Sequence, residues 1–503
     1  MKQLGAQDSQ FLYMETGNNL AHVTGVSVYD PSTAPGGKVR FKDIIEHMKG
    51  RLDSSPVFRR RLVRVPFELD YPYWAEDEYF DIEYHIRHGR LPEPGDWRQF
   101  CIHLARYHSR PLDMQRPLWE MFVIEGLDRV EGMPPGSYAI ATKLHHAAVD
   151  GASAIRFFGA LSDIDARGTP AYRLGDSYEE PGRAPALPDM MGRAFLNNVK
   201  SPIRFAETLL RAAPALYGAA RKVVGGDSSG RQRVPDTRFN RAVSPHKMFD
   251  AAIFELADFK AIKKAVEGAT INDVVLAICS GGLRHYLQKH NELPDESAVA
   301  WVPINARAPQ SASTESKAAG NNISAMTVPI GTDIEDPVAR LRAITATTQE
   351  TKAAKAGLSA RLMTDLSKHV PGATMALASR LILKSTASMR VCNLFISNVP
   401  GPQTALYMNG ARMIHSLGMA PLADGMGLFI ATPSYNGEMA FNVTSTREVL
   451  PDIEFFMDCL RKSFAELQAA TVRQSSKTKT KSNKKTKRAI ATRGRADGTA
   501  AAG

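Results

Sequence analysis

The sequence predicts a protein of the α/β class, in the broad α+β sense, with two domains. The chain has 503 residues, which is too many for one ordinary hydrophobic core. Residues 1–180 and 249–470 each mix β-like runs with amphipathic helical patterns. Between them, residues 181–248 are rich in Pro, Gly, Arg and Ser, which is typical of a linker carrying a basic helical excursion. Residues 471–503 are rich in Lys, Ser and Thr, and we expect a disordered tail there.

The composition is that of a soluble globular protein, with 44% hydrophobic and 23% charged residues. No apolar run reaches the ~18 residues that a membrane-spanning helix needs, and the N-terminal segment lacks an apolar signal core. We therefore expect the chain to stay in the cytoplasm. The four cysteines are scattered and form no CxxC pair, which disfavours a disulfide framework and a zinc site.

The positive charge is concentrated in the tail. From Arg473 onward, ten basic residues and one acidic residue carry +9 of the formal net charge of +11. Because a Lys/Arg run is usually a solvated or membrane-seeking tail, we predict no nucleic-acid partner.

Local patterns predict several elements. Ser137–Leu144 is β-like and ends just before two adjacent histidines, and Ala152–Leu161 has helical apolar spacing. Thr270 has the position of a helix N-cap. Gly427–Thr432 and Met439–Thr444 resemble paired strands around an Asn-Gly turn.

The strongest chemical signal is the segment KLHHAAVDG, in which His145, His146, Asp150 and Gly151 stand within seven residues. A strand points alternate side chains to opposite faces. If the strand runs through the pair, His145 shares a face with Lys143 and His146 takes the other face. Only one of the two histidines can then enter a given channel. Gly151 allows a tight turn into the next helix.

A neutral imidazole suits the removal of a proton from a hydroxyl group. The hydroxyl oxygen can then attack a thioester carbonyl directly, so no Ser or Cys nucleophile is needed. The alternatives are a structural role for the whole motif and a metal site. We predict no metal, because adjacent histidines on opposite strand faces cannot easily bind one ion. For Asp150 we favour an orienting or ion-pairing role over a catalytic one.

HHAAVDG matches the HHxxxDG signature of the CoA-dependent acyltransferase superfamily. Other segments resemble the bacterial wax ester synthase/diacylglycerol acyltransferase family, as does the opening MKQLGAQDSQFLYMET. These segments are RPLWE (Arg116–Glu120), INDVVLA (Ile271–Ala277), VPINAR (Val302–Arg307) and SNVPGP (Ser397–Pro402). The resemblance covers about residues 1–470 and leaves the tail out.

The resemblance implies two chloramphenicol-acetyltransferase-like subdomains that form a pseudo-dimer with a tunnel between them. The second histidine of the pair, here His146, would be the catalytic base, and His145 would lie beside it. A coenzyme A thioester would enter as a substrate from one side, with no bound cofactor. A long-chain alcohol or diacylglycerol would enter from the other side, giving wax ester or triacylglycerol.

Three further residues have a structural and a functional interpretation. We expect Trp119 to pack in the core, because tryptophan is large and usually buried. Asp273 fits the capping pattern that begins at Thr270, so we expect it to start a helix. Asn272 could instead approach the channel, since helix N-termini stabilise developing negative charge.

Two more assignments follow from the wider superfamily. The resemblance implies that Arg307 pairs with Asp150, although a surface arginine is the simple alternative. A hydroxyl near the position of Ser397 holds the oxyanion in related enzymes, and a plain strand-end serine is the equal alternative.

The sequence leaves other functions open. The chain could use a carrier-protein thioester or another hydroxyl acceptor, or be a non-catalytic lipid-body protein. For an acyltransferase with nearly insoluble substrates, we expect peripheral association with a membrane or lipid-body surface. The basic, partly apolar stretch Met190–Val224 and the tail could supply it. The alternatives are an ordinary helix packed on the body and a solubilising extension.

Overall fold

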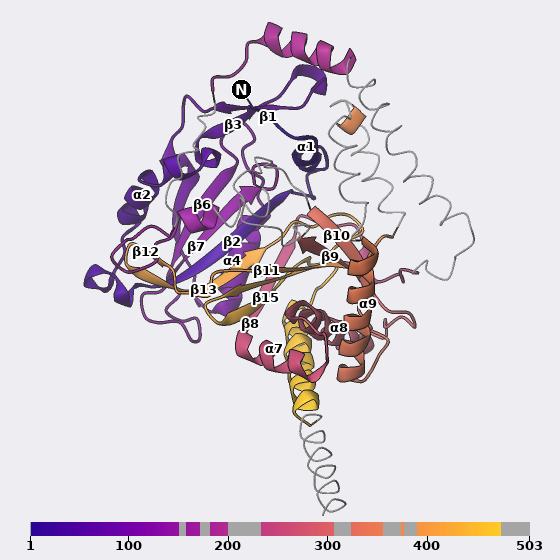
Figure 1. The fold of residues 1–503 in the computed structure, drawn as a ribbon. Coiled ribbons are helices and arrows are strands. Elements are labelled where there is room, and N and C mark those ends of the chain that lie inside the picture. Colours follow the sequence, from indigo (N-terminus) through magenta and orange to yellow (C-terminus); the bar gives the residue numbers. More distant parts are fainter. Residues whose placement is uncertain are drawn as a thin grey trace, which may run out of the picture.

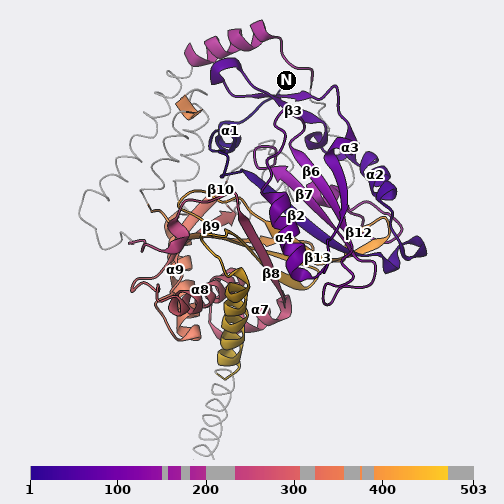
Figure 2. The same ribbon diagram turned by 180° about the vertical axis from the view of Figure 1, so that it is seen from behind.

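The computed structural model describes residues 2–149, 157–171, 182–199, 233–305, 323–355, 374–376 and 390–473. These residues form two six-stranded mixed sheets and a small three-stranded sheet, with helices packed around them (Figures 1 and 2). The predicted α/β architecture of two similar halves is therefore confirmed.

The first six-stranded sheet has the strand order β12-β13-β2-β7-β6-β5. Its strands are β2 (His22–Asp30), β5 (Ile86–Arg90), β6 (Trp119–Glu125), β7 (Tyr138–His145), β12 (Tyr407–Met408) and β13 (Ala411–Met419). The helix α2 (Phe41–Lys49) shares an apolar core with one face of this sheet, and α4 (Trp97–His108) shares another with the opposite face. Strand β7, fully buried along its length, thus lies between two apolar layers.

Two strands of the first sheet come from the C-terminal part of the chain. Strand β13 pairs antiparallel with β2, from Arg412 opposite Asp30 to Met419 opposite Thr24. Its buried side chains join the cores of the first half, which explains why it adds to this sheet. The range 249–470 therefore contributes to both halves, by a crossover that its sequence does not indicate.

The second six-stranded sheet has the order β10-β9-β11-β14-β15-β8. Its strands are β8 (Lys247–Glu255), β9 (Val299–Asn305), β10 (Ile323–Pro329), β11 (Leu394–Pro400), β14 (Phe429–Tyr435) and β15 (Glu438–Thr446). Among the described residues, this half includes the helices α7 (Leu256–Ile262), α8 (Ile271–Lys289), α9 (Pro337–Lys355) and a C-terminal helix over residues 453–473.

The hairpin predicted around Asn-Gly is confirmed. Strands β14 and β15 pair antiparallel, and Asn436 and Gly437 have φ values of 45° and 89°. Positive φ at both central residues is what a tight two-residue hairpin turn requires, and Asn-Gly tolerates it best.

The small sheet has the order β1-β4-β3, with β1 (Lys2–Gln3), β3 (Arg60–Val63) and β4 (Tyr73–Glu76). The short helices α1 (Ala6–Tyr13) and α3 (Ile82–His85) belong to the same half. Short 3-10 turns lie at Pro31–Thr33, Pro35–Gly37, Leu52–Ser54, Pro56–Phe58, Pro66–Glu68, Arg238–Asn240 and Lys263–Ala265. Within the predicted excursion, residues 187–199 form a helix beside the small sheet, magenta at the top of Figure 1. No described helix is both long and apolar enough to cross a bilayer.

Candidate active site

The histidine pair stands at the end of β7, in the interior of the first sheet. The β-like pattern predicted for Ser137–Leu144 is confirmed, since β7 covers Tyr138–His145. Backbone hydrogen bonds to the segments just before β6 and β2 fix the position of both histidines. The amide of His145 donates to the carbonyl of Leu118 at 3.0 Å, and that of His146 donates to the carbonyl of Ala21 at 2.8 Å. Both imidazoles therefore start from a fixed backbone.

His145 is completely buried, and its two ring nitrogens have different surroundings. Its Nδ1 accepts a hydrogen bond from the amide of Ala147 at 3.1 Å. In a neutral imidazole that accepts at Nδ1, the proton sits on Nε2. Nε2 lies 3.5 Å from Oε2 of Glu15, whose Oε1 accepts from the amide of Ala21 at 3.2 Å. His145 is thus tied to the loop after it and to the segment that follows α1.

His146 has different surroundings. Its ring is half-buried and stacks on the ring of Phe11 in α1, with centroids 4.0 Å apart and planes inclined by 14°. An aromatic ring parallel to an imidazole limits its rotation. The two histidines therefore lie in separate environments, as strand alternation predicts.

A layer of buried polar side chains continues the His145 face across the sheet. His22 stands directly opposite His145 on β2, and its Nε2 donates to the carbonyl of His108 at 2.6 Å. Nδ1 of His108 lies 2.8 Å from the hydroxyl of Thr24. Burial lowers the pKa of His108 to about 3, and burial together with the charges of His108 and Lys143 holds the pKa of His22 well below its ordinary value. Both are neutral at pH 7.

Lys143 is the cation of this layer and is completely buried. Its ammonium donates to the carbonyls of Tyr107 at 3.1 Å and Arg110 at 2.8 Å, at the C-terminal end of α4. It also lies 3.4 Å from a carboxylate oxygen of Glu120. Burial lowers the pKa of Lys143, and the carboxylate of Glu120 opposes that shift. A cation at a helix C-terminus satisfies carbonyls that lack intrahelical partners.

The loop after His146 is anchored by Arg60. Its Nη2 donates to the carbonyl of Ala148 at 2.7 Å, and its guanidinium lies 4.2 Å from the ring centroid of Trp74. Burial lowers the pKa of Arg60 to about 10, so it remains a cation at neutral pH. The sequence gives no sign of this role for Arg60, because 88 residues separate it from Ala148 and its local pattern is only a basic residue in a short strand.

The segment beyond the loop packs on the same side of the sheet as Leu144. Residues 157–160 are helical, and Phe157 joins the core that contains Leu144. A Cβ placed on Gly25 would come within 2.6 Å of the Phe158 ring, so this glycine lets the segment approach β2. The helix predicted over Ala152–Leu161 ends one residue earlier, since Leu161 is in a turn, and its residues 152–156 lie outside the described part of the chain.

Trp119 and Asp273 occupy structural positions. Trp119 is completely buried, and its Nε1 donates to the carbonyl of Phe58 at 3.0 Å. The predicted N-cap is confirmed: the Thr270 hydroxyl accepts from the Asp273 amide at 3.3 Å, and the Asp273 carboxylate accepts from the Thr270 amide at 2.8 Å. That carboxylate also accepts from the Thr348 hydroxyl of α9 at 2.8 Å.

The remaining predicted residues belong to the second half or lie outside the described residues. Asn272 at the start of α8 and Ser397 in β11 are half-buried. Asp150, Gly151 and Arg307 are outside the described part of the chain, so the bridge between Asp150 and Arg307 stays a prediction. Within the described ranges, no group of three or more His, Cys, Asp or Glu side chains is placed to hold a metal ion.

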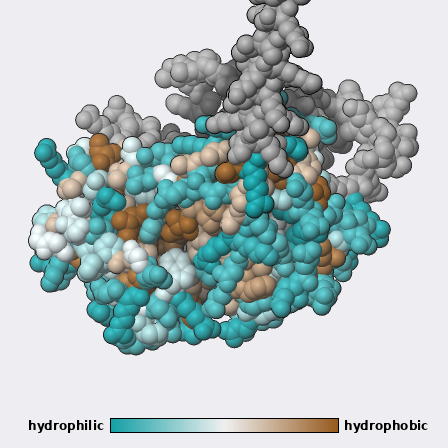
Figure 3. Space-filling view, turned by 90° about the horizontal axis from the view of Figure 1, so that it is seen from below, coloured by the Kyte–Doolittle hydropathy of each residue, from teal (hydrophilic) through white to brown (hydrophobic). Residues whose placement is uncertain are grey.

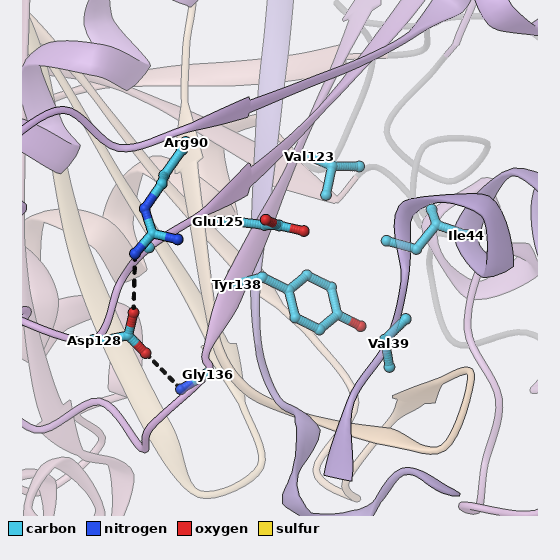
Figure 4. A pocket seen from close by; sticks show the side chains of 9 residues that line it. Val39, Ile44, Arg90, Val123, Glu125, Asp128, Gly136 and Tyr138 are labelled. Carbon is cyan, nitrogen blue, oxygen red and sulfur yellow. Dashed lines mark hydrogen bonds and ion pairs between the residues drawn. The ribbon is translucent and has the colours of Figure 1, made fainter. Parts of the chain in front are cut away.

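A cavity of about 120 Å³ opens at the other end of β7 (Figure 4). Tyr138, the first residue of β7, lines it together with Arg90 and Asp128, which approach each other to 3.8 Å. Seven residues at ~3.3 Å each place this cavity roughly 23 Å along the strand from His145. It is therefore separate from the histidine site, and its volume is small for a drug-sized ligand.

Comparison with known proteins decides the family. A model described as the wax ester synthase/diacylglycerol acyltransferase catalytic domain matches residues 4–275, and a WS/DGAT C-terminal domain model matches residues 319–468. The chain belongs to the wax ester synthase/diacylglycerol acyltransferase family. A candidate diacylglycerol O-acyltransferase of Mycobacterium tuberculosis is 31% identical, over 93% of this chain and 90% of its own. One from Mycobacterium bovis is 29% identical, over 92% and 98%.

Solved structures agree with this assignment. The wax ester synthase/diacylglycerol acyltransferase from Marinobacter aquaeolei VT8 is 27% identical, with a TM-score of 0.66, over 94% of this chain and all of that one. The first condensation domain of the calcium-dependent antibiotic synthetase shares the fold, with a TM-score of 0.55 at 14% identity over 94% of this chain and 97% of that one. This wax ester synthase/diacylglycerol acyltransferase family member is an acyltransferase built from two subdomains.

Proposed function

We propose that the protein transfers a fatty acyl group from acyl-CoA to a long-chain alcohol or diacylglycerol, with His146 as general base. The observation that carries the assignment is the contrast within the pair. His145 is completely buried, with Nδ1 hydrogen-bonded and Nε2 3.5 Å from the carboxylate of Glu15, whereas His146 is half-buried at the end of the strand. A general base has to come within hydrogen-bond reach of its substrate, and of the two only His146 retains exposed surface.

The reaction needs one base and two substrates. His146 takes the proton of the acceptor hydroxyl while the hydroxyl oxygen attacks the thioester carbonyl carbon. The bond between that carbon and sulfur then breaks. The imidazolium returns the proton to the departing thiolate, which leaves an ester and free coenzyme A. No acylated protein forms.

The cysteines support direct transfer. All four are buried and free. Burial raises the pKa of Cys392 to about 12 and that of Cys459 to about 11, and raises the pKa values of Cys101 and Cys279 as well. Since the thiolate is the nucleophile, none of these groups is poised to accept an acyl chain.

We also propose that the protein works at the surface of a membrane or lipid body, because both acceptors are nearly insoluble in water. Peripheral contact would be made by apolar side chains at the headgroup boundary. The tail, which would add an electrostatic contribution, lies outside the described residues beyond Arg473.

Product analysis tests the proposal. The purified protein is offered one acyl-CoA with hexadecanol and diacylglycerol together, and in parallel the same acyl group on a carrier protein. We expect wax ester, triacylglycerol or both from acyl-CoA. Intact-mass analysis after acyl-CoA alone should show no acylated protein. Transfer only from the carrier protein would contradict the donor assignment, and a trapped acyl-Ser or acyl-Cys would contradict direct attack.

A further inference from the structure

One face of the 187–199 helix is held firmly against the protein. Met190 and Ala194 are buried with Val65 and Tyr73 in a small apolar cluster. At the end of the helix, the side-chain amide of Asn197 donates to the Asp70 carboxylate at 2.7 Å. These contacts fix the rotation of the helix, and thereby decide which side chains face outward.

The outward face is apolar. Phe195 is 70% exposed and Leu196 is 52% exposed, and other large apolar side chains of the helix are also exposed. Together with one residue of the neighbouring turn they form a surface that we call the apolar patch: Phe67, Leu187, Met191, Phe195, Leu196 and Val199. By contrast, hydrophilic side chains dominate the face shown in Figure 3, and apolar ones occur there in small groups. A patch of large apolar side chains on an otherwise polar surface marks an interaction site.

Phe67 is held outward at a conformational cost. Its side chain is 90% exposed, and it and Glu68 have φ values of 58° and 55°. Bulky residues rarely adopt this left-handed region, and such strain persists where the surrounding structure imposes it. The side-chain amide of Asn198 donates to the carbonyl of Leu69 at 2.8 Å, which ties the turn to the helix. The turn that carries Phe67 is therefore fixed to the end of the helix.

This surface is connected to the histidine site through α1. Leu12 and Tyr13 of α1 line a small cavity together with Val65 and Asp70 of the segment that supports the helix. On the same short helix, Phe11 stacks on His146. The helix α1 thus borders both the segment that supports the apolar patch and the proposed base.

We propose that the apolar patch is the surface by which the protein inserts into the boundary of a phospholipid layer. This inference rests on the proposed function, which requires access to an acceptor dissolved in lipid. A helix with one docked face and one apolar face can lie in the plane of a membrane and insert the apolar face. An apolar side chain that projects outward, such as that of Phe67, can insert between lipid headgroups. Docking there would bring α1, and through it His146, next to the lipid.

The charges around the patch predict how binding responds to salt. On the helix, Asp189 offsets Arg193, and on the turn Arg64 lies 3.9 Å from Glu68. With positive and negative charges balanced, insertion has to come from apolar burial, which salt does not screen. Binding through the patch should therefore persist at high salt and need no anionic lipid. Electrostatic binding by the tail should instead weaken at high salt and require anionic lipid.

Co-sedimentation of the full chain with neutral phosphatidylcholine vesicles at low and high salt tests the proposal. The variant carries Phe195→Ser and Leu196→Ser, and the matched control is Ile164→Ser, because Ile164 is 53% exposed and lies outside the patch. We expect the double variant to bind ~10- to 100-fold more weakly at both salt concentrations, since burying each side chain is worth about a tenfold change or more. The control should bind like the wild type.

A second variant separates loss of binding from loss of folding. Phe67→Gly removes the phenyl ring and also relieves the left-handed strain. It should bind vesicles more weakly while its melting temperature stays level or rises. Weaker binding accompanied by a lower melting temperature would instead indicate a folding defect and would count against the patch.

Several results would overturn the proposal. The wild type could fail to bind neutral vesicles, or the double variant could bind them as tightly as the wild type does. Analytical ultracentrifugation could also show a dimer of the wild type that the double variant does not form. The proposed function is judged separately, by wild-type esterification of a water-soluble short-chain alcohol. If that reaction occurs and vesicle binding does not, only the surface assignment fails. If the apolar patch is the membrane-binding surface, the double variant has a lower ratio of activity on vesicle-borne acceptor to activity on soluble acceptor than the wild type has.

Discussion

The two halves of the molecule have similar sheets but different interiors. In the second half, the core between α8 and its sheet is apolar, and residues from Val274 to Cys279 are buried throughout. In the first half, the central strand carries Lys143 and His145 into a buried polar layer before it delivers His146 to the end of the sheet. The difference fits the proposed function, in which one half holds the proposed base in place and the other supplies a framework.

This polar layer is tolerated because its buried cation is paired and two of its histidines stay neutral. Lys143 has two carbonyls and a carboxylate around its ammonium, and His22 and His108 stay neutral. An unpaired buried charge would cost several kcal/mol, so removing single members of the layer should be costly. The described core beneath α8 in the framework half is apolar instead, and this contrast can be tested.

The largest expected effect is on turnover, and it comes from His146, which directly follows β7. His146→Ala should lower kcat by roughly 10²- to 10⁴-fold, because general base catalysis contributes about that much. The ring is half-buried and stands at the end of the strand, where it stacks on Phe11, so the variant should fold. Steady-state kinetics with acyl-CoA and hexadecanol, together with a melting curve, would show both. Wild-type turnover in a folded variant would remove the mechanism.

The next largest effect is on the stability of the fold at acid pH, and it is caused by a buried histidine of the polar layer. The folded-state pKa of His108 is about 3, well below its ordinary value, because of burial. Below pH 6.5 the unfolded chain binds a proton that the folded chain refuses, so stability falls as pH decreases from about 6.5 towards 3. Each pH unit in that window costs about 1.4 kcal/mol for such a histidine.

Melting temperatures between pH 7.5 and 5 would measure this slope. His108→Gln should flatten it, since glutamine does not titrate in that range. A slope that is the same in wild type and variant would show that His108 does not cause the acid sensitivity.

A smaller effect on turnover is expected at Glu15, whose carboxylate lies beside His145. Glu15→Gln keeps the shape of the side chain but removes the negative charge 3.5 Å from His145. Misplacing the neighbouring loop should lower kcat by roughly 10-fold, with little change in KM, because the group acts through position. A loss as large as that of His146→Ala would mean that Glu15 and His145 take part in proton transfer themselves.

The smallest effect is expected in the framework half. Asp273→Ala removes the capping partner of Thr270 and the acceptor of Thr348, which should cost about 1–2 kcal/mol of stability. Activity per folded molecule should change little, and the acid slope should stay as in the wild type. Chemical denaturation and kcat measured on the same preparation would test this. A large loss of kcat with intact stability would place the start of α8 in the site.

The sequence predicted those parts of the structure that depend on neighbouring residues. The strand before the histidines, the cap at Thr270 and the Asn436-Gly437 turn all follow from local patterns, and all are present. The separate faces of the two histidines follow from the alternation of a strand.

Features that depend on distant residues were not predictable in this way. Glu15 meets His145 across 130 residues of chain, and β13 joins a sheet whose other long strands are encoded far upstream. His22 and Lys143 lie on facing strands, and only the register brings them into one buried layer. A single sequence gives no direct signal for such pairings, because the physical cause lies in packing between segments.

Chemical rescue tests the central claim, that His146 is the base and His145 its support, most directly. Imidazole is added to His146→Ala and, separately, to His145→Ala, while acyl transfer to a soluble alcohol is followed. The claim predicts that imidazole restores part of the turnover of His146→Ala in proportion to its neutral form and has little effect on His145→Ala. Rescue of His145→Ala alone, with none for His146→Ala, would contradict it.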